Sequence, residues 1–172
     1  MKNVFRKIET VEIEACYNII VGRTNWLNKQ GIRQWSQPIP ENVILERQKA
    51  GRLFGYWSND ELVAVVCLLD KSVSNWKDLL QGKYLYMATL ASDIRYKGRK
   101  FGQACATAAC QYAKESGYEK IYLDCIDNQG ALPNFYAKLG YKIIEKKKSE
   151  DSRVDILMSN IYWIEVLMIA KD

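Results

Sequence analysis

The sequence contains no histidine. Histidine is the usual general base of serine and cysteine hydrolases and the commonest metal ligand in proteins. Its absence excludes Ser-His-Asp hydrolysis, Cys-His proteolysis, and zinc or iron chemistry that depends on imidazole ligands. Any proton transfer by this chain must therefore use Tyr, Asp, Glu, Lys, Cys or water.

Cysteine is present but lacks the spacing of a metal site or a disulfide framework. There are five cysteines, an odd number, and none lies in a CxxC pair. They are Cys16, Cys67, Cys105, Cys110 and Cys125. We expect reduced thiols packed in the core, and no metal site.

Long apolar runs are also missing. No segment reaches the roughly 18 to 20 apolar residues of a membrane-spanning helix, and residues 1–7 lack the apolar core of a secretory signal. We therefore expect a cytoplasmic protein with no membrane partner. With 172 residues, 48% of them hydrophobic, residues 1–172 are predicted to form a single domain. The net charge of +5 fits a nucleic acid, a phosphorylated cofactor or simple solubility.

Apolar periodicity and turn residues predict a mixed α/β order of elements. In the first half we expect a strand at 3–9, a helix from 13 to about 31, a short helix at 41–50, and hairpin strands at 52–58 and 61–69. In the second half we expect a strand at 83–91, a basic turn at 94–102, a helix at 103–116, strands at 120–126 and 141–146 around a short helix at 131–139, and a closing strand at 161–170.

The middle of this order places a basic, glycine-containing turn directly before a helix. The amide groups at a helix N-terminus have no acceptor within the helix, and the helix dipole favours negative charge there. Residues 97–103 are therefore predicted to bind an anion such as a phosphate group.

Residues 90–103, LASDIRYKGRKFGQ, resemble the acetyl-CoA signature of the GNAT superfamily. In that family the pattern is Gln or Arg, two residues, Gly, one residue, then Gly or Ala. Those places fall here on Lys97, Lys100 and Gly102. Lys97 keeps the positive charge, whereas Lys100 replaces a glycine that lets the backbone approach phosphate closely.

Two further segments carry the same resemblance. Residues 127–141 are similar to the family segment in which an Asn precedes a short helix, and their last seven residues, FYAKLGY, form the most specific motif of the chain. Residues 25–35 are similar to the first helix and following loop of many bacterial members. The resemblance is strong over about 84–146 and loose elsewhere.

The resemblance implies a GNAT-like fold, with a central, mostly antiparallel, twisted sheet of about seven strands flanked by about four helices. It also implies an acetyl-CoA-dependent N-acetyltransferase that uses acetyl-CoA as cosubstrate and no metal. The acceptor would be a primary amine of a small molecule or peptide, attacking the thioester directly in a ternary complex. No nucleic acid partner is expected, and an exposed final strand would allow a homodimer.

The same resemblance assigns site residues. The cosubstrate would contact Leu90, Ala91, Ser92, Lys97, Gly98, Arg99, Lys100, Phe101, Gly102, Gln103, Asn128 and Asn134. Tyr136 matches the tyrosine that protonates the departing CoA thiolate; a phenol with a pKa of about 10 suits a thiol with a pKa of about 8.5. Strand 84–91 lacks the glutamate that many relatives carry, so Asp124, Glu165 or a water chain are open as the base.

The acceptor side is less defined. Trp26, Trp35, Tyr86 and Trp163 are candidates for the acceptor pocket or for core packing. Trp76, with the loop 70–82, is a candidate cover of the site. Two other classes of function stay open: an acyl-CoA-binding regulator without catalysis, and a small nucleic-acid binder, which only the basic charge supports.

Overall fold

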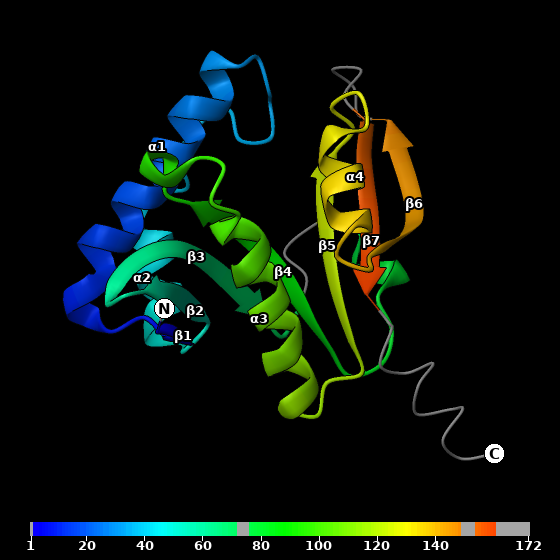
Figure 1. Ribbon diagram of the computed structural model, residues 1–172. Helices are drawn as coiled ribbons and strands as arrows, with labels where there is room; N and C mark the ends of the chain where they lie inside the picture. Colours follow the sequence, from blue (N-terminus) through cyan, green and yellow to red (C-terminus); the bar gives the residue numbers. More distant parts are fainter. Residues whose placement is uncertain (1, 72–75, 149–153, 161–172) are drawn as a thin grey trace. The chain divides into compact units, whose positions relative to one another are not determined.

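The computed structural model describes residues 2–71, 76–148 and 154–160 (Figure 1). The helices are α1 (Ile13–Lys29), α2 (Glu41–Lys49), α3 (Phe101–Glu115) and α4 (Ala131–Ala137). The strands are β1 (Asn3–Lys7), β2 (Leu53–Ser58), β3 (Glu61–Leu69), β4 (Tyr84–Ser92), β5 (Lys120–Ile126), β6 (Lys142–Lys148) and β7 (Val154–Asn160). Short 3-10 helices lie at Thr10–Glu12 (η1), Lys77–Leu79 (η2) and Ile94–Tyr96 (η3).

These strands form a seven-stranded sheet in the order β1-β2-β3-β4-β5-β7-β6. Strands β4 and β5 pair in parallel, whereas the pairs β1–β2, β2–β3, β5–β7 and β6–β7 are antiparallel. The mixed, mostly antiparallel sheet of about seven strands with four helices is thus confirmed. The crossover from β4 to the parallel β5 runs through α3, as parallel pairing requires.

One strand of the structure was not expected from the sequence. The strand that lies between β5 and β6 is β7, at residues 154–160. The expected closing strand at 161–170 lies outside the described residues. The short segment was missed because its apolar run, Ile156 to Met158, is only three residues long and is followed by a polar Ser159. The side chains of residues 156–159 are all almost fully buried, so the usual alternation of apolar and polar side chains is absent.

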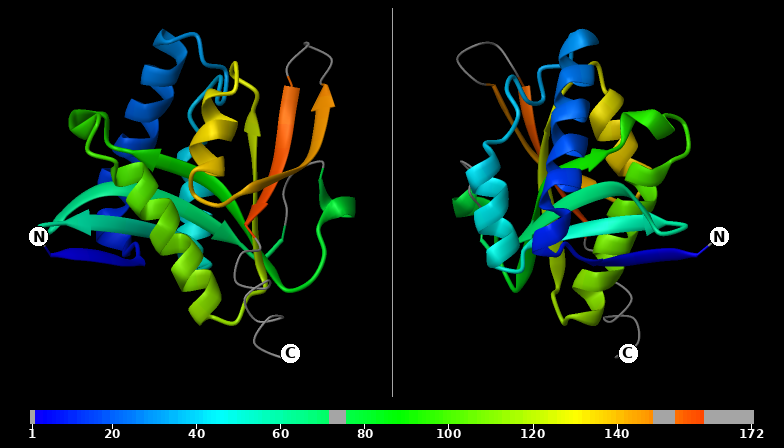
Figure 2. Two further views of the ribbon diagram at one scale, coloured as in Figure 1. Left: turned by 45° about the vertical axis from the view of Figure 1, so that its right-hand side comes forward. Right: turned by 90° about the vertical axis from the view of Figure 1, so that its left-hand side faces the viewer.

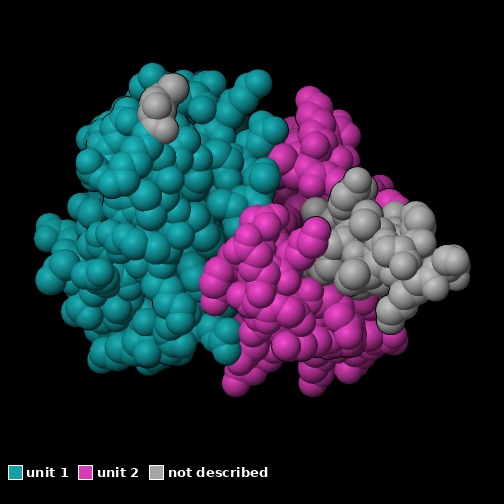
Figure 3. All heavy atoms as spheres, turned by 60° about the horizontal axis from the view of Figure 1, so that its bottom comes forward, with its two compact units in different colours: residues 1–68, 88–109 teal, residues 69–87, 110–172 magenta. Residues whose placement is uncertain are grey.

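The chain divides into two compact units, coloured separately in Figure 3. Unit 1 comprises residues 1–68 and 88–109, and unit 2 comprises residues 69–87 and 110–172. Strand β4 belongs to both: its residues 84–87 lie in unit 2 and its residues 88–92 in unit 1. The single domain expected from the sequence stays a prediction.

Unit 1 is built on the β2–β3 hairpin. Asn59 and Asp60 join the two strands with φ angles of 51° and 64°, the backbone that a tight hairpin turn requires. Residues 63–69 of β3 are buried without alternation, because helices cover both faces of the strand. Helices α1 and α2 lie on one side of the hairpin and the first half of α3 on the other (Figure 2).

Unit 2 is built on strands β5, β7 and β6, with α4 packed beside β5 and β6 (Figure 1). Its core includes Ile121, Leu123 and Leu157, which are at most 1% exposed. Every residue of β6 is exposed, and the strand ends in three lysines, 146–148. Such charge protects an edge strand from pairing with other chains.

Candidate active site

Helix α3 begins at Phe101, two residues earlier than expected, directly after the basic turn. The amide of Ala104 donates to the carbonyl of Lys100 at 3.0 Å, which starts the helical pattern. The amides of Phe101, Gly102 and Gln103 therefore have no acceptor within the helix. The Arg99 amide instead donates to the Tyr96 carbonyl at 3.1 Å.

Two residues of this turn have a left-handed backbone. Gly98 has a φ of 86° and Lys100 a φ of 60°. Glycine adopts this conformation without a steric penalty, whereas an L-residue with a Cβ pays roughly 1 kcal/mol or more. The geometry thus accounts for the glycine of the family pattern, and the departure at Lys100 keeps the same backbone and adds an exposed cation.

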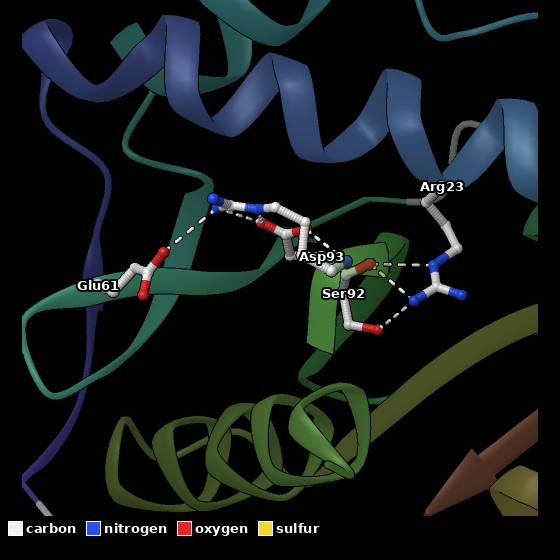
Figure 4. A network of polar contacts seen from close by, with 5 residues as sticks. Arg23, Glu61, Ser92 and Asp93 are labelled. Carbon is white, nitrogen blue, oxygen red and sulfur yellow. Dashed lines mark hydrogen bonds and ion pairs between the residues drawn. The ribbon is translucent and has the colours of Figure 1, made fainter. Parts of the chain in front are cut away.

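Arg23 of α1 binds the end of β4 in unit 1 (Figure 4). Its Nε and Nη2 donate to the Ser92 carbonyl oxygen at 3.0 and 2.7 Å, and Nη2 also donates to Ser92 Oγ at 2.7 Å. Burial lowers the pKa of Arg23, and the charge of Asp93 opposes that shift. Gly102 of α3 also lies close to Ser92, since an added Cβ there would come within 3.3 Å of Ser92 Oγ. Arg23 and Gly102 therefore confine Ser92 from two elements.

Asp93 continues the network at the start of η3 (Figure 4). Its carboxylate accepts hydrogen bonds from the Arg95 amide at 2.9 Å and from the Arg95 guanidinium at 2.7 and 2.9 Å. The Asp93 amide donates to the Val63 carbonyl at 2.9 Å, which ties the turn to β3. Burial opposes ionisation of Asp93, but the bonds from Arg95 and the charges of Arg95 and Arg23 outweigh it, so its pKa is lowered.

Trp26 lies beside the same turn. The guanidinium carbon of Arg23 and the ammonium nitrogen of Lys97 are each 5.1 Å from its ring centroid. Two cations on one ring gather positive charge at the turn. Trp35 is half-buried in the loop after α1, and Trp163 lies outside the described residues.

Strand β4 contains a strained residue just before Leu90. Thr89 has a φ of 58°, a conformation that is rare for a β-branched residue. Its Oγ1 accepts a hydrogen bond from Arg47 Nη1 of α2 at 3.0 Å. Backbone strain of this kind persists only where the surroundings enforce it, and it concentrates at functional sites.

In unit 2, Tyr136 lies on α4 with its ring half-buried. The ring centroids of Phe135 and Tyr141 are 5.0 and 5.7 Å away, both in edge-to-face geometry. Burial raises the pKa of Tyr136 far above its usual value, and Cys125 and Asp124 add to the shift. The hydroxyl is therefore a neutral donor over the physiological pH range, in an environment that a carboxylate influences.

The same unit holds a tyrosine–carboxylate pair. Tyr86 of β4, only 1% exposed, donates its hydroxyl hydrogen to Asp124 Oδ1 of β5. The two strands are parallel neighbours, with Tyr86 opposite Tyr122 and Met87 opposite Leu123. Of the candidate bases, Asp124 thus lies next to the Tyr86 hydroxyl, which can pass on a proton. Glu165 lies outside the described residues. Tyr86 was a candidate for the acceptor pocket, but its bond to Asp124 had no sequence signal.

Of the two asparagines of the predicted site, Asn128 lies in the turn before α4 and Asn134 within α4. The Asn128 carbonyl accepts a hydrogen bond from the Ala131 amide at 2.9 Å. The Asn134 side chain is exposed and covers Gly130, where an added Cβ would come within 3.2 Å of Asn134 Nδ2. Trp76, the candidate cover, is buried at 5% exposure within unit 2.

The cysteines are free thiols, as expected. Four are buried and Cys110 is half-buried. Burial raises the pKa of Cys16, Cys67 and Cys105, and it raises that of Cys125 to about 12 with help from nearby carboxylates. These four thiols are therefore neutral at physiological pH. Within residues 2–71, 76–148 and 154–160, no three Cys, Asp or Glu side chains gather as metal ligands, and no helix is long and apolar enough to cross a bilayer.

The chain matches a known protein family. Residues 20–141 match the acetyltransferase (GNAT) family. The chain is 29% identical over 146 residues to an uncharacterised N-acetyltransferase, YesJ, of Bacillus subtilis strain 168, covering 77% of this chain and 78% of the relative.

Solved structures agree in fold. A GNAT-family acetyltransferase of Listeria monocytogenes 4b F2365 has a TM-score of 0.77 at 19% identity, with coverage of 91% of this chain and 93% of the other. The PaiA N-acetyltransferase of Thermoplasma acidophilum, solved with coenzyme A, has a TM-score of 0.64 at 19% identity, with coverage of 94% and 100%. Because the family match spans most of the chain and includes the basic turn and the Tyr136 helix, this protein belongs to the GNAT family of N-acetyltransferases.

Proposed function

We propose that this enzyme transfers an acetyl group from acetyl-CoA to a primary amine by direct attack, without a covalent enzyme intermediate. The family uses acyl-CoA donors. The observation that carries the proposal is the set of amides at 101–103, next to a turn with three exposed cations: Lys97, Arg99 and Lys100. Unpaired amides at a helix N-terminus and exposed cations suit the CoA diphosphate.

The end of β4 is proposed to hold the pantetheine arm and the thioester. Leu90 and Ser92 would offer backbone groups to the arm, and Arg23 fixes Ser92 in place. The left-handed backbone at Thr89 interrupts the regular strand just before these residues. A backbone amide released from strand pairing there would stabilise the oxyanion that forms when the amine attacks.

The leaving group is assigned to Tyr136. As the C–N bond forms and the C–S bond breaks, the electron pair of that bond moves to sulfur. The neutral Tyr136 hydroxyl donates a hydrogen bond to the developing thiolate. Because the pKa of Tyr136 is raised, its role is to stabilise the thiolate through this bond, and the proton that the amine loses supplies the final thiol.

The base is assigned to Asp124, acting with Tyr86. The carboxylate accepts the proton that the acceptor's ammonium loses to become the attacking amine, directly or through the Tyr86 hydroxyl, which already donates to Asp124. The charge of Asp124 also adds to the raised pKa of Tyr136, after burial and Cys125, which supports placing the proposed base near the proposed leaving group. This carboxylate on β5 replaces the one that β4 lacks.

Direct transfer is tested by a single-turnover experiment with labelled acetyl-CoA and no amine. After an acid quench, no label is expected on the denatured protein, since the buried thiols are neutral and poor nucleophiles. Addition of an amine mixture is expected to release CoA and labelled amide. Stoichiometric label on a cysteine would overturn direct attack. Binding of acetyl-CoA without release of CoA by any amine would favour the acyl-CoA-binding regulator, which the substitution at Lys100 motivates.

A further inference from the structure

Arg47 of α2 inserts its guanidinium among neutral groups of unit 1. Its Nη1 donates to Thr89 Oγ1 at 3.0 Å and to Cys67 Sγ at 3.5 Å. Cys67 is fully buried and its pKa is raised by that burial, so the thiol is uncharged. Arg47 itself is half-buried. A guanidinium is thus partly removed from water without a counter-ion supplied by either of these partners.

The charge stays uncompensated within the part of the chain that the structure describes. The ion pairs there join Arg6 to Glu12 and Arg95 to Asp93 and Glu61, and none includes Arg47. Among the described residues, Ser159 Oγ is the one fully buried side-chain nitrogen or oxygen without a hydrogen-bond partner, so no Arg47 nitrogen there is both fully buried and unpaired. Removing a charge from water is costly unless the charge is paired, so a carboxylate partner would stabilise Arg47 here.

Arg47 contacts a residue next to the proposed site of acetyl transfer. Its partner Thr89 immediately precedes Leu90, where the thioester is proposed to lie, and consecutive Cα atoms are about 3.8 Å apart. Thr89 is also the residue with the strained backbone, with a φ of 58°. In an α-amino acid, only one carbon separates the amine nitrogen from the carboxylate. A molecule of that size spans from Arg47 to a thioester at the neighbouring residue.

We propose that Arg47 binds a carboxylate of the acceptor, so that the enzyme acetylates the amine of a small amino acid or a closely related amino carboxylate. The inference rests on the function proposed above and narrows its acceptor. Nη1 is held by Thr89 and Cys67, which leaves the edge formed by Nε and Nη2 for a bidentate carboxylate. The acceptor's carboxylate supplies the counter-ion that the described residues do not.

The test compares matched acceptors. CoA release is measured with a panel of free L-amino acids and with the corresponding C-terminal amides, which keep the amine and side chain and lose only the carboxylate charge. The wild type is expected to prefer at least one acid over its amide by about 10- to 100-fold in kcat/KM. Arg47→Gln is expected to lower that ratio to near one, and Arg47→Lys to restore part of it.

A control variant separates binding from support of the strand. Thr89→Val removes the hydroxyl that Arg47 contacts but keeps the guanidinium and the shape of the side chain. It is expected to retain the preference for the acid, whereas a purely structural role of Arg47 predicts that Thr89→Val and Arg47→Gln have the same effect. Acetyl-CoA stabilisation, read by thermal shift in the same samples, reports on the donor site independently.

Three results would overturn the assignment: amides used as well as acids by the wild type, a preference that survives Arg47→Gln, or acetyl-CoA binding with no turnover of any amino acid. If acetyl-CoA does not raise the Tm of the wild type, the proposed donor site is contradicted instead. The failure of the proposed function and the failure of the carboxylate subsite are thus distinguishable.

Discussion

Arg23 of α1 and Ser92 of β4, 69 residues apart in the sequence, are joined by three hydrogen bonds of 2.7 to 3.0 Å. The guanidinium holds both the carbonyl and the hydroxyl of Ser92, and an added Cβ at Gly102 would come within 3.3 Å of that hydroxyl. The end of β4, which is part of the proposed donor site, is therefore fixed by a residue from the first helix (Figure 4).

Removing this clamp is expected to weaken acetyl-CoA binding. Arg23→Gln loses at least two charge-assisted hydrogen bonds, and we expect the Kd for acetyl-CoA to rise by about tenfold. Isothermal titration calorimetry measures the change. The matched control is Arg99→Gln, which removes an exposed cation of the turn but no bond to Ser92. A Kd for Arg23→Gln no higher than that of the control would contradict the clamp.

Lys100→Gly tests the strained turn. Glycine tolerates the φ of 60° that Lys100 adopts, so relief of strain is expected to raise the free energy of unfolding by about 0.5 to 1 kcal/mol and the Tm by about 1 to 4 °C. Binding of acetyl-CoA should persist with a weaker salt dependence, since one cation is lost. Gly98→Ala, at a φ of 86° with open space around it, should destabilise the protein. A lower Tm for Lys100→Gly would argue against a left-handed backbone there.

Tyr136→Phe removes the hydroxyl but keeps the ring packing on Phe135 and Tyr141. We expect kcat to fall by about 100-fold while the Kd for acetyl-CoA changes less than twofold. The raised pKa of Tyr136 also predicts that the wild-type rate shows no decline from tyrosine ionisation up to about pH 10. A tyrosine that only packs in the core would lower Tm in the phenylalanine variant and leave kcat nearly unchanged.

Asp93 is expected to make the free energy of unfolding depend on pH in the acidic range. Its folded-state pKa lies below the usual value of about 3.9, so its contribution is complete well above that pH and is lost as the pH falls through the folded-state pKa. At pH 7, Asp93→Asn should destabilise the protein by about 1 to 3 kcal/mol. Thermal denaturation from pH 7 to pH 2 should show the two proteins converging at the acidic end. A constant difference in stability would contradict the shift.

Much of the fold could be predicted from local sequence. The bounds of β3 and β5 agree with the expected 61–69 and 120–126, since long apolar runs ended by turn residues define both strands. Strand β7 could not be found in this way because its buried run is short and its neighbours are polar. Its place between β5 and β6 depends on pairing with both strands, and its partners on β5, such as Ile121 opposite Asn160, are distant in the sequence.

The site could be predicted only where it is local. The turn at 97–103 and the Tyr136 helix are continuous segments with recognisable residues. The sequence did not mark Arg23 or Arg47 as site residues, because an arginine on a helix is usually solvated. Their roles arise from contacts with residues of β4 that are 69 and 42 positions away in the sequence. The structure also explains Lys100, whose departure from the glycine pattern keeps the left-handed backbone.

The most direct test of the donor site is a thermal-shift titration with acetyl-CoA on the wild type, Gly102→Glu and Gly102→Gln. A Cβ at residue 102 would already lie within 3.3 Å of Ser92 Oγ, and a glutamate adds negative charge beside the amides proposed to hold the diphosphate. In the wild type, acetyl-CoA at about 100 times its Kd is expected to stabilise the fold by about 2.7 kcal/mol, a shift of several degrees. Gly102→Glu should show no shift, and Gly102→Gln a smaller loss. Equal shifts in the wild type and Gly102→Glu, or none in the wild type at millimolar acetyl-CoA, would contradict a donor site at this turn.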